Sequence, residues 1–173
     1  GKPGVCVATS GPGATNLITG IATAYADSIP LICITGQVDS SLLGGDVFQE
    51  ADITGAAESF VKYSYLVKDA NDIPRIMKEA FHIATTGRKG PVLIDVPIDI
   101  QNKTISGFKY PEEVNMRTYK PTVKGHAVQL KKVINELQKA KKPVILAGGG
   151  VILSGAQKEL RDFSHKYGIP VVT

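Results

Sequence analysis

The sequence predicts an α/β protein built on parallel, doubly wound sheets with flanking helices. Short apolar runs rich in β-branched residues alternate with amphipathic helical stretches, and glycine-rich turns follow several of the runs. The run at residues 31–35 (LICIT) is apolar throughout, which is typical of a parallel strand covered on both faces. Apolar residues make up 43% of the 173-residue chain, which is enough to bury a core.

The first half of the chain alternates strands and helices. We expect strands at residues 5–9, 31–35, 63–67 and 91–96, and helices at about 14–26, 50–59 and 73–84. The last helix is the clearest, because Ile73, Ile76, Met77, Ala80, Phe81 and Ala84 recur at helical spacing. Asn71 or Asp72 can cap its start, Pro74 suits its first turn and Gly87 suits its end.

From Pro97 the pattern gives way to a polar, proline-containing stretch, which predicts an interdomain linker over residues 98–124. A second α/β unit follows. It contains a helix with Ala127, Leu130, Val133, Ile134 and Leu137 on one side, a strand at 143–147, a glycine turn at 148–150, a helix ending near Gly168 and a strand at 170–173. Ser154 and Gln157 have capping-box spacing at the start of its second helix. The predicted domains are therefore 1–97 and 125–173. Because the chain lacks an initiating Met and begins and ends close to strands, we expect a piece of a longer polypeptide.

Composition excludes several classes of function. A formal charge of +4 is a weak basic bias, and aromatics, at 6%, do not interleave with the basic residues, so we expect no nucleic-acid partner. No apolar run approaches the ~18 residues of a membrane span. Cys6 and Cys33 lie inside apolar runs and predict buried free thiols in the reducing cytoplasm. The three histidines lack ligand spacing, so no metal site is expected in this chain.

Two segments follow predicted strands at the end where open α/β sheets bind ligands. The turn at 10–16 (SGPGATN) leads into a helix. The loop at 38–53 (VDSSLLGGDVFQEADI) presents an aromatic, an amide and a carboxylate at Phe48, Gln49 and Glu50. A loop that only joins a strand to a helix does not require these residue types, so we expect a small polar ligand at this loop.

The spacing alone leaves alternatives open. Asn16 stands where a dinucleotide fingerprint needs its third glycine, so the turn at 10–16 fits a plain strand-to-helix connection equally well. The glycines at 148–150 fit a tight turn or a nucleotide contact. Arg88, in the turn before the strand at 91–96, is either a solvated loop charge or a phosphate clamp. A non-catalytic nucleotide-binding module is therefore competitive with an enzyme.

At these residues the chain resembles the large, catalytic subunit of the acetolactate synthase (acetohydroxyacid synthase) family, thiamine-diphosphate enzymes of branched-chain amino-acid synthesis. The matching stretches are GKPGVCVATSGPGATNL, AYADSIPLICITGQV, GGDVFQEADI, YLVKDANDIPRIMKEAFHIATTGRKGPVLIDVP and KKPVILAGGGV. They cover nearly all of the chain outside residues 98–124. FQEADI and AFHIATTGR point to this family rather than to thiamine-diphosphate enzymes in general.

The resemblance implies an identity for each domain and a set of site residues. Residues 1–97 would be most of the domain that binds the aminopyrimidine ring of thiamine diphosphate, and 125–173 the start of a central domain in which FAD is structural. Phe48 and Gln49 would be catalytic at the reacting end of thiamine, and Lys62, also counted as catalytic, would lie near the substrate entrance. Pro12, Asn16 and Gln49 would bind thiamine diphosphate, whereas Arg88, Gly148, Gly149 and Gly150 would contact FAD.

The resemblance also implies a reaction. The family decarboxylates pyruvate on thiamine diphosphate and condenses the resulting enamine with a second 2-oxo acid. The family's activating glutamate, and its domain for the diphosphate and Mg²⁺, are expected outside this chain, so we expect the isolated chain to be inactive. A dimer-based homo-oligomer is implied, and a small regulatory subunit is compatible with it. Pyruvate oxidase and glyoxylate carboligase are the alternatives among thiamine-diphosphate enzymes, and GGDVFQEADI argues against both.

Two positions depart from the family pattern. Many relatives have Pro where Asp39 stands and Lys where Ile98 stands. Both positions border the substrate channel of the family, so access to the site is expected to differ in detail.

Overall fold

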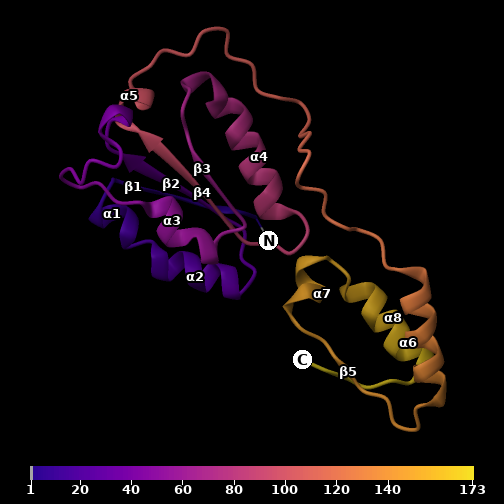
Figure 1. Cartoon of the computed structure of the whole chain (residues 1–173). Helices are drawn as coiled ribbons and strands as arrows, with labels where there is room; N and C mark the ends of the chain where they lie inside the picture. The colour runs from indigo at the N-terminus through magenta and orange to yellow at the C-terminus, as the bar shows by residue number, and fades with distance from the viewer. Residues whose placement is uncertain (1) are drawn as a thin grey trace. The chain divides into compact units, whose positions relative to one another are not determined.

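The computed structural model describes residues 2–173, which form two compact units, residues 2–121 and 122–173. Each unit contains a parallel sheet with helices beside it (Figure 1), which confirms the predicted fold class. Among residues 2–173, no helix is both long and apolar enough to cross a membrane.

The first unit is built on a four-stranded sheet with the strand order β1-β2-β4-β3, and every pairing in it is parallel. The strands are β1 (Gly4–Ala8), β2 (Leu31–Gln37), β3 (Tyr63–Leu66) and β4 (Pro91–Pro97). β2 and β4 occupy the two central places and pair along their whole lengths. Their near-continuous apolar sequences follow from this position, because helices cover both faces of the sheet there.

Helices α2 (Ile18–Ala26) and α3 (Ile53–Ala57) cover one face of this sheet, and α4 (Ile73–Thr85) covers the other (Figure 1). Side chains alternate between the two faces along each strand. Cys33 therefore packs in the cluster that contains residues of α2 and α3, whereas its neighbour Ile32 packs in the cluster of α4. Both cysteines are free thiols, as predicted, with Cys33 buried and Cys6 half-buried beside it on β1.

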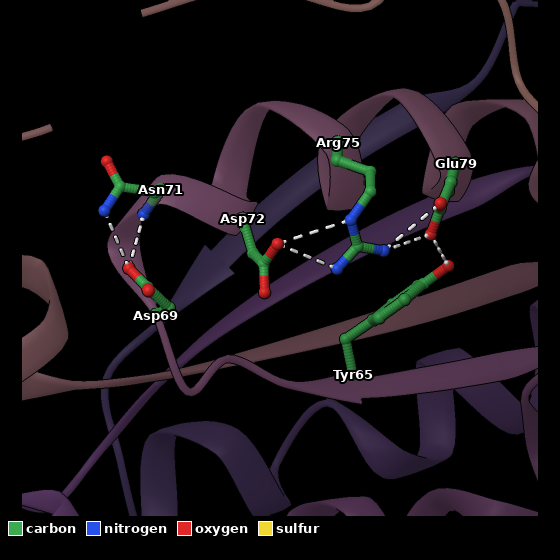
Figure 2. A network of polar contacts seen from close by, with 6 residues as sticks. All are labelled: Tyr65, Asp69, Asn71, Asp72, Arg75 and Glu79. Atoms are coloured by element: carbon green, nitrogen blue, oxygen red, sulfur yellow. Dashed lines mark hydrogen bonds and ion pairs between the residues drawn. The ribbon is translucent and has the colours of Figure 1, made fainter. Parts of the chain in front are cut away.

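A polar network joins the start of α4 to the edge strand β3 (Figure 2). Tyr65 on β3 donates a hydrogen bond to Glu79 at 2.9 Å, and Arg75 lies between Glu79 and Asp72 with ion pairs of 3.0 and 3.1 Å. Asp72 makes no side-chain cap, in contrast to the sequence expectation, because its carboxylate binds Arg75 instead. Gly87 has φ 58° just beyond the helix, as expected for a residue that ends one.

Two predicted helices differ from their expected ranges: one is divided and the other is shorter. The helix expected at 14–26 is divided into α1 (Pro12–Thr15) and α2, because the Leu17 N–H bonds to Ala14, three residues back, and tightens the turn there. The helix expected at 50–59 begins after Asp52, whose side chain accepts from the Gly55 N–H at 2.9 Å, and ends in a 3₁₀ turn at Glu58–Phe60.

Much of the segment predicted as a linker, residues 98–124, belongs to the first unit, whose boundary falls between residues 121 and 122. It begins with a short helix, α5 (Ile98–Gln101), in which Ile100 is buried. Ile105, Met116 and Tyr119 then pack against the α4 side of the core. These widely spaced apolar residues have no period, which is why the sequence pattern alone did not place them in a core.

The second unit has a two-stranded parallel sheet. Its elements are α6 (Ala127–Lys139), β5 (Ile145–Leu146), α7 (Gly149–Leu153), α8 (Gln157–Tyr167) and β6 (Val171–Val172). The capping box expected from Ser154 and Gln157 does not form, because the Ser154 hydroxyl donates backwards to the Gly150 carbonyl at 2.7 Å. Gly168 ends α8 with φ 63°, as predicted.

Candidate functional site

A cavity of about 690 Å³ lies at the carboxyl ends of β1, β2 and β4. Apolar side chains, among them Val7, Ile34 and Val96, line it together with polar groups of Ser10, Gln37, Gln49 and Gln101. Of the described residues that line this cavity, none carries a charge. Open parallel sheets bind ligands at this edge, so the position agrees with that expected for the two glycine-containing segments.

The turn at 10–16 and the loop at 38–53 meet at Gly11. This glycine is buried and has φ 59°, and a Cβ atom at its position would lie 2.8 Å from the Gln49 carbonyl oxygen and 2.9 Å from Gln49 Cα. Only glycine therefore permits this approach of the two backbones without a shift. Two segments that are separated in sequence, and were both predicted to contact a ligand, form one wall of the cavity.

The loop between β2 and α3 presents Phe48 and Gln49 to the cavity. Phe48 is 90% exposed, and Gln49 adopts φ 60°, which is unusual for a residue with a side chain. The loop is nevertheless held by a carboxylate of its own. Glu50 accepts from the N–H groups of Gly44 and Val47, and the Gly44 N–H in particular holds the pKa of Glu50 below its usual value.

A second anchor joins this loop to the helix that follows β4. Asp99 on α5 accepts hydrogen bonds from the Ser40 N–H at 3.0 Å and the Ser40 hydroxyl at 2.9 Å. These bonds, led by that of the Ser40 N–H, hold the pKa of Asp99 below its usual value. An exposed aromatic side chain on a loop with several internal anchors is typical of a binding wall that is formed before the ligand arrives.

A buried polar cluster, defined as Thr35, Gln37 and Asp95, lies behind the loop. The Thr35 hydroxyl donates to Asp95 Oδ1 at 2.6 Å, and Gln37 Nε2 donates to Asp95 Oδ2 at 2.9 Å. Asp95 is 1% exposed, and its burial raises its pKa, although the two hydrogen bonds oppose that shift. No motif or spacing predicted this cluster. The only indication of this cluster in the sequence is Asp95, the single charged residue in the otherwise apolar strand PVLIDVP.

The other residues predicted for the thiamine site lie beside the cavity or away from it. Pro12 and Asn16 lie at exposed positions on α1 and at its end, next to the wall formed by Gly11, and are not among the described residues that line the cavity. Ile98, one of the two departures from the family pattern, does line it. An apolar, partly exposed side chain therefore stands at this point of the lining.

The structure does not bring Lys62 to this cavity. Lys62 precedes β3, and its N–H binds the Pro91 carbonyl at 2.8 Å where β4 begins, so it lies at the amino edge of the sheet. Its ammonium group donates to the carbonyls of Ile83 and Thr86 at the end of α4 and to the Tyr119 hydroxyl. These contacts stabilise the end of a helix and the segment that packs on it.

Arg88 also lies at the amino edge of the sheet, before β4. Its guanidinium donates to the Ser28 hydroxyl at 2.9 Å and to the carbonyls of Tyr25 and Ala26, at the end of α2, at 3.1 and 3.2 Å. The guanidinium therefore binds the carboxyl end of α2, where the Tyr25 carbonyl also accepts from the Ser28 N–H at 3.3 Å. Within the first unit Arg88 acts as a helix cap.

The second unit has a cavity of about 570 Å³, lined in part by Gly148, Gly149, Gln157 and Arg161. A Cβ atom added at any of residues 148–150 would meet no atom within 4 Å, so packing inside this unit does not require glycine there. The space beside these backbones is open to a ligand. Among the described residues of the whole chain, no group of three or more His, Cys, Asp or Glu side chains is placed to hold a metal ion.

Comparison with known proteins identifies the family. Residues 1–56 match the thiamine pyrophosphate enzyme N-terminal TPP binding domain, and residues 130–173 match the thiamine pyrophosphate enzyme central domain. The chain is 56% identical to the acetolactate synthase large subunit of Buchnera aphidicola subsp. Schizaphis graminum and 51% identical to that of Corynebacterium glutamicum. It is 50% identical to the acetolactate synthase isozyme 3 large subunit of Escherichia coli.

These alignments cover 99 to 100% of the chain but only 28 to 30% of each relative, so the chain spans less than a third of the length of the curated relatives it matches. The relatives align across both of the matched domains. The chain therefore belongs to the thiamine pyrophosphate enzymes and, among them, to the acetolactate synthase large-subunit family.

Proposed function

We propose that the protein containing this chain is an acetolactate synthase, a carboligase that decarboxylates pyruvate and joins the product to a second 2-oxo acid. The identity of 50 to 56% to relatives with that name supports this function over pyruvate oxidase, glyoxylate carboligase or a non-catalytic nucleotide-binding module. The observation that carries the proposal is the meeting of Gly11 and Gln49 beside a cavity at the carboxyl edge of the sheet.

The cavity suits the aminopyrimidine ring of thiamine diphosphate, which carries no charge. Its lining combines apolar side chains with the amides of Gln49 and Gln101, which matches a planar heterocycle that needs a few hydrogen bonds. When bound, thiamine diphosphate supplies a ring that accepts the electron pair left behind as carbon dioxide departs from a 2-oxo acid. We assign Phe48 and Gln49 to the reacting end of the thiamine and Pro12 and Asn16 to its pyrimidine side.

The chain's own residues would orient the reactants and exclude water. The exposed Phe48 ring offers apolar area that covers a bound ligand, and the Gln49 amide offers both a donor and an acceptor. The uncharged lining offers no cation to a diphosphate. We therefore place the diphosphate and Mg²⁺ sites in parts of the protein beyond this chain, and we expect no turnover from the 173 residues alone.

We further propose that the second unit contacts FAD in a structural role through Gly148, Gly149 and Gly150. The open space beside these three backbones, and the Arg161 side chain in the same cavity, support a nucleotide there. The FAD contact of Arg88 stays a prediction, since its guanidinium already binds the end of α2.

The remaining proposals concern assembly and location. The relatives are named large subunits, which supports a small regulatory subunit as a partner, and we propose a dimer-based homo-oligomer as the catalytic form. Exposed apolar side chains on α6, including Val128, Leu130 and Val133, support burial of this helix against other parts of the protein. We place the protein in the cytoplasm, since both thiols are free.

The product formed by the full-length protein tests this function. We expect acetolactate from pyruvate when thiamine diphosphate and Mg²⁺ are added, and no acetolactate when thiamine diphosphate is omitted. The isolated chain, assayed in the same way, should form none. A different product from the full-length protein, or tight NAD binding without any turnover of pyruvate, would contradict the proposal.

A further inference from the structure

One side chain connects the two ends of the loop between β2 and α3. Gln37, the last residue of β2, accepts a hydrogen bond from the Val38 N–H through Oε1 at 2.9 Å, at the start of the loop. Its Nε2 donates to the Ala51 carbonyl at 2.8 Å, at the end of the loop. A single amide group therefore fixes where residues 38–51 leave the sheet and where they return.

Asp95 fixes the orientation of the Gln37 amide group from the side opposite the loop. Nε2 of Gln37 also donates to Asp95 Oδ2 at 2.9 Å, and the other carboxylate oxygen accepts from Thr35. Both oxygens of Asp95 therefore act as acceptors, and only the amide nitrogen of Gln37 can face it. With the nitrogen in that place, the Gln37 oxygen necessarily faces the Val38 N–H.

We infer that Asp95 is a positioning residue that acts through Gln37 to hold the loop carrying Phe48 and Gln49 against Gly11. Its importance for catalysis rests on the proposed function of this cavity. Asp95 is not among the described residues that line the cavity, so its effect on the site would be exerted through the loop.

The substitution Asp95→Asn shows the consequence. If the oxygen of the new amide accepts from Thr35, its nitrogen faces the Gln37 amide nitrogen, and two donors oppose each other. Rotating the Gln37 amide relieves that conflict, but its oxygen then faces the Ala51 carbonyl and its nitrogen faces the Val38 N–H. The first arrangement leaves two amide nitrogens facing each other, and the second breaks both bonds of Gln37 to the loop. Turning the new amide so that its nitrogen faces Thr35 instead deprives the buried Thr35 hydroxyl of its acceptor.

The geometry of Gln49 makes the loop dependent on this anchor. Gln49 lies two residues before Ala51 and has φ 60°, a conformation that side-chain-bearing residues keep only where their surroundings impose it. Its carbonyl is seated close to where a Cβ atom of Gly11 would be. Loss of the bond to Ala51 makes the backbone next to this strained position mobile. The Gln49 side chain then occupies several positions instead of one.

Hydrogen–deuterium exchange on the full-length protein tests this inference without reference to turnover. We expect Asp95→Asn, and independently Gln37→Met, to speed exchange of the amides in residues 38–51 by about tenfold or more, because two loop hydrogen bonds are lost. Thr35→Val removes a donor to Asp95 but leaves the Gln37 bonds in place, so it should lower the melting temperature without speeding loop exchange.

Tyr65→Phe is the matched control for general destabilisation. Tyr65 lies on the edge strand β3, and the change removes its hydrogen bond of 2.9 Å to Glu79 on α4 (Figure 2). It should change neither the loop exchange nor the turnover number. We expect the turnover number of Asp95→Asn and Gln37→Met to fall about tenfold, since each change loses hydrogen bonds that hold the loop. Unchanged loop exchange in both of these variants, or equal acceleration in Tyr65→Phe, would overturn the inference. If the parent full-length protein forms no acetolactate but both variants still exchange faster in the loop, the proposed function is refuted and the positioning role stands.

Discussion

Replacing Gly11 with alanine perturbs the contact on which the site depends. An alanine at φ 59° and ψ −122° lies outside the left-handed helical region, in a conformation that side-chain-bearing residues rarely adopt, and costs about 1–3 kcal/mol. Its Cβ atom would also lie 2.8 Å from the Gln49 carbonyl oxygen and 2.9 Å from Gln49 Cα, closer than van der Waals contact allows. Backbone atoms cannot rotate away as a flexible side chain can, so the loop must move, at about 1–3 kcal/mol. Together these costs predict a loss of about 2–6 kcal/mol.

Urea unfolding of the 173-residue chain, followed by circular dichroism, measures this loss. Gly20→Ala is the matched control, because a Cβ atom at Gly20 in α2 would meet no atom within 4 Å. Alanine is preferred there by about 1 kcal/mol, so the control should be slightly more stable than the parent chain. If Gly11→Ala is as stable as the parent chain, the close approach of the two backbones is refuted.

The contacts of single side chains lead to three further predictions. Lys62→Met should cost about 2–3 kcal/mol in the same unfolding experiment, because charge-assisted bonds to helix carbonyls are lost; reduced turnover of the full-length protein without reduced stability would instead favour the predicted role at the substrate entrance. The pKa of Glu50 is lowered in the folded loop, so its contribution is present above the ordinary carboxyl pKa and is lost as the pH falls through the lowered value. Loop amides should therefore lose exchange protection below about pH 4, and Glu50→Gln should abolish this pH dependence; equal protection in the parent chain on both sides of that pH would contradict it. Cys33, which is buried and has a raised pKa, should react with thiol reagents only on unfolding, whereas Cys6 should react sooner; rapid labelling of native Cys33 would show that β2 is open.

Local pattern was sufficient for most of the fold and for part of the site. The apolar run LICIT and the helical stripe from Ile73 to Ala84 identify β2 and α4, since both signals lie within a few consecutive residues. Phe48 and Gln49 could be placed at the ligand-binding edge for a similar reason, because loops after parallel strands gather at one edge of the sheet. The same rule places Lys62, directly before a strand, at the opposite edge.

Contacts between distant residues could not be predicted in this way. Gln37 and Asp95 are 58 residues apart, and nothing in the spacing of either strand shows that they bond. The packing of Tyr119 under the end of α4 similarly depends on the course of an irregular segment. Such contacts are set by tertiary structure, and a lone polar residue in an apolar strand is the one local sign of them.

A structure of the full-length protein with thiamine diphosphate bound tests the assignment of the site most directly. We predict that the aminopyrimidine and thiazolium rings lie in the cavity at the carboxyl ends of β1, β2 and β4, with the thiazolium ring in contact with Phe48 and Gln49. The loop of residues 38–51 should keep its bonds from Gln37 to Val38 and Ala51. A ring bound elsewhere, with this cavity filled by water or by another part of the chain, would contradict the assignment.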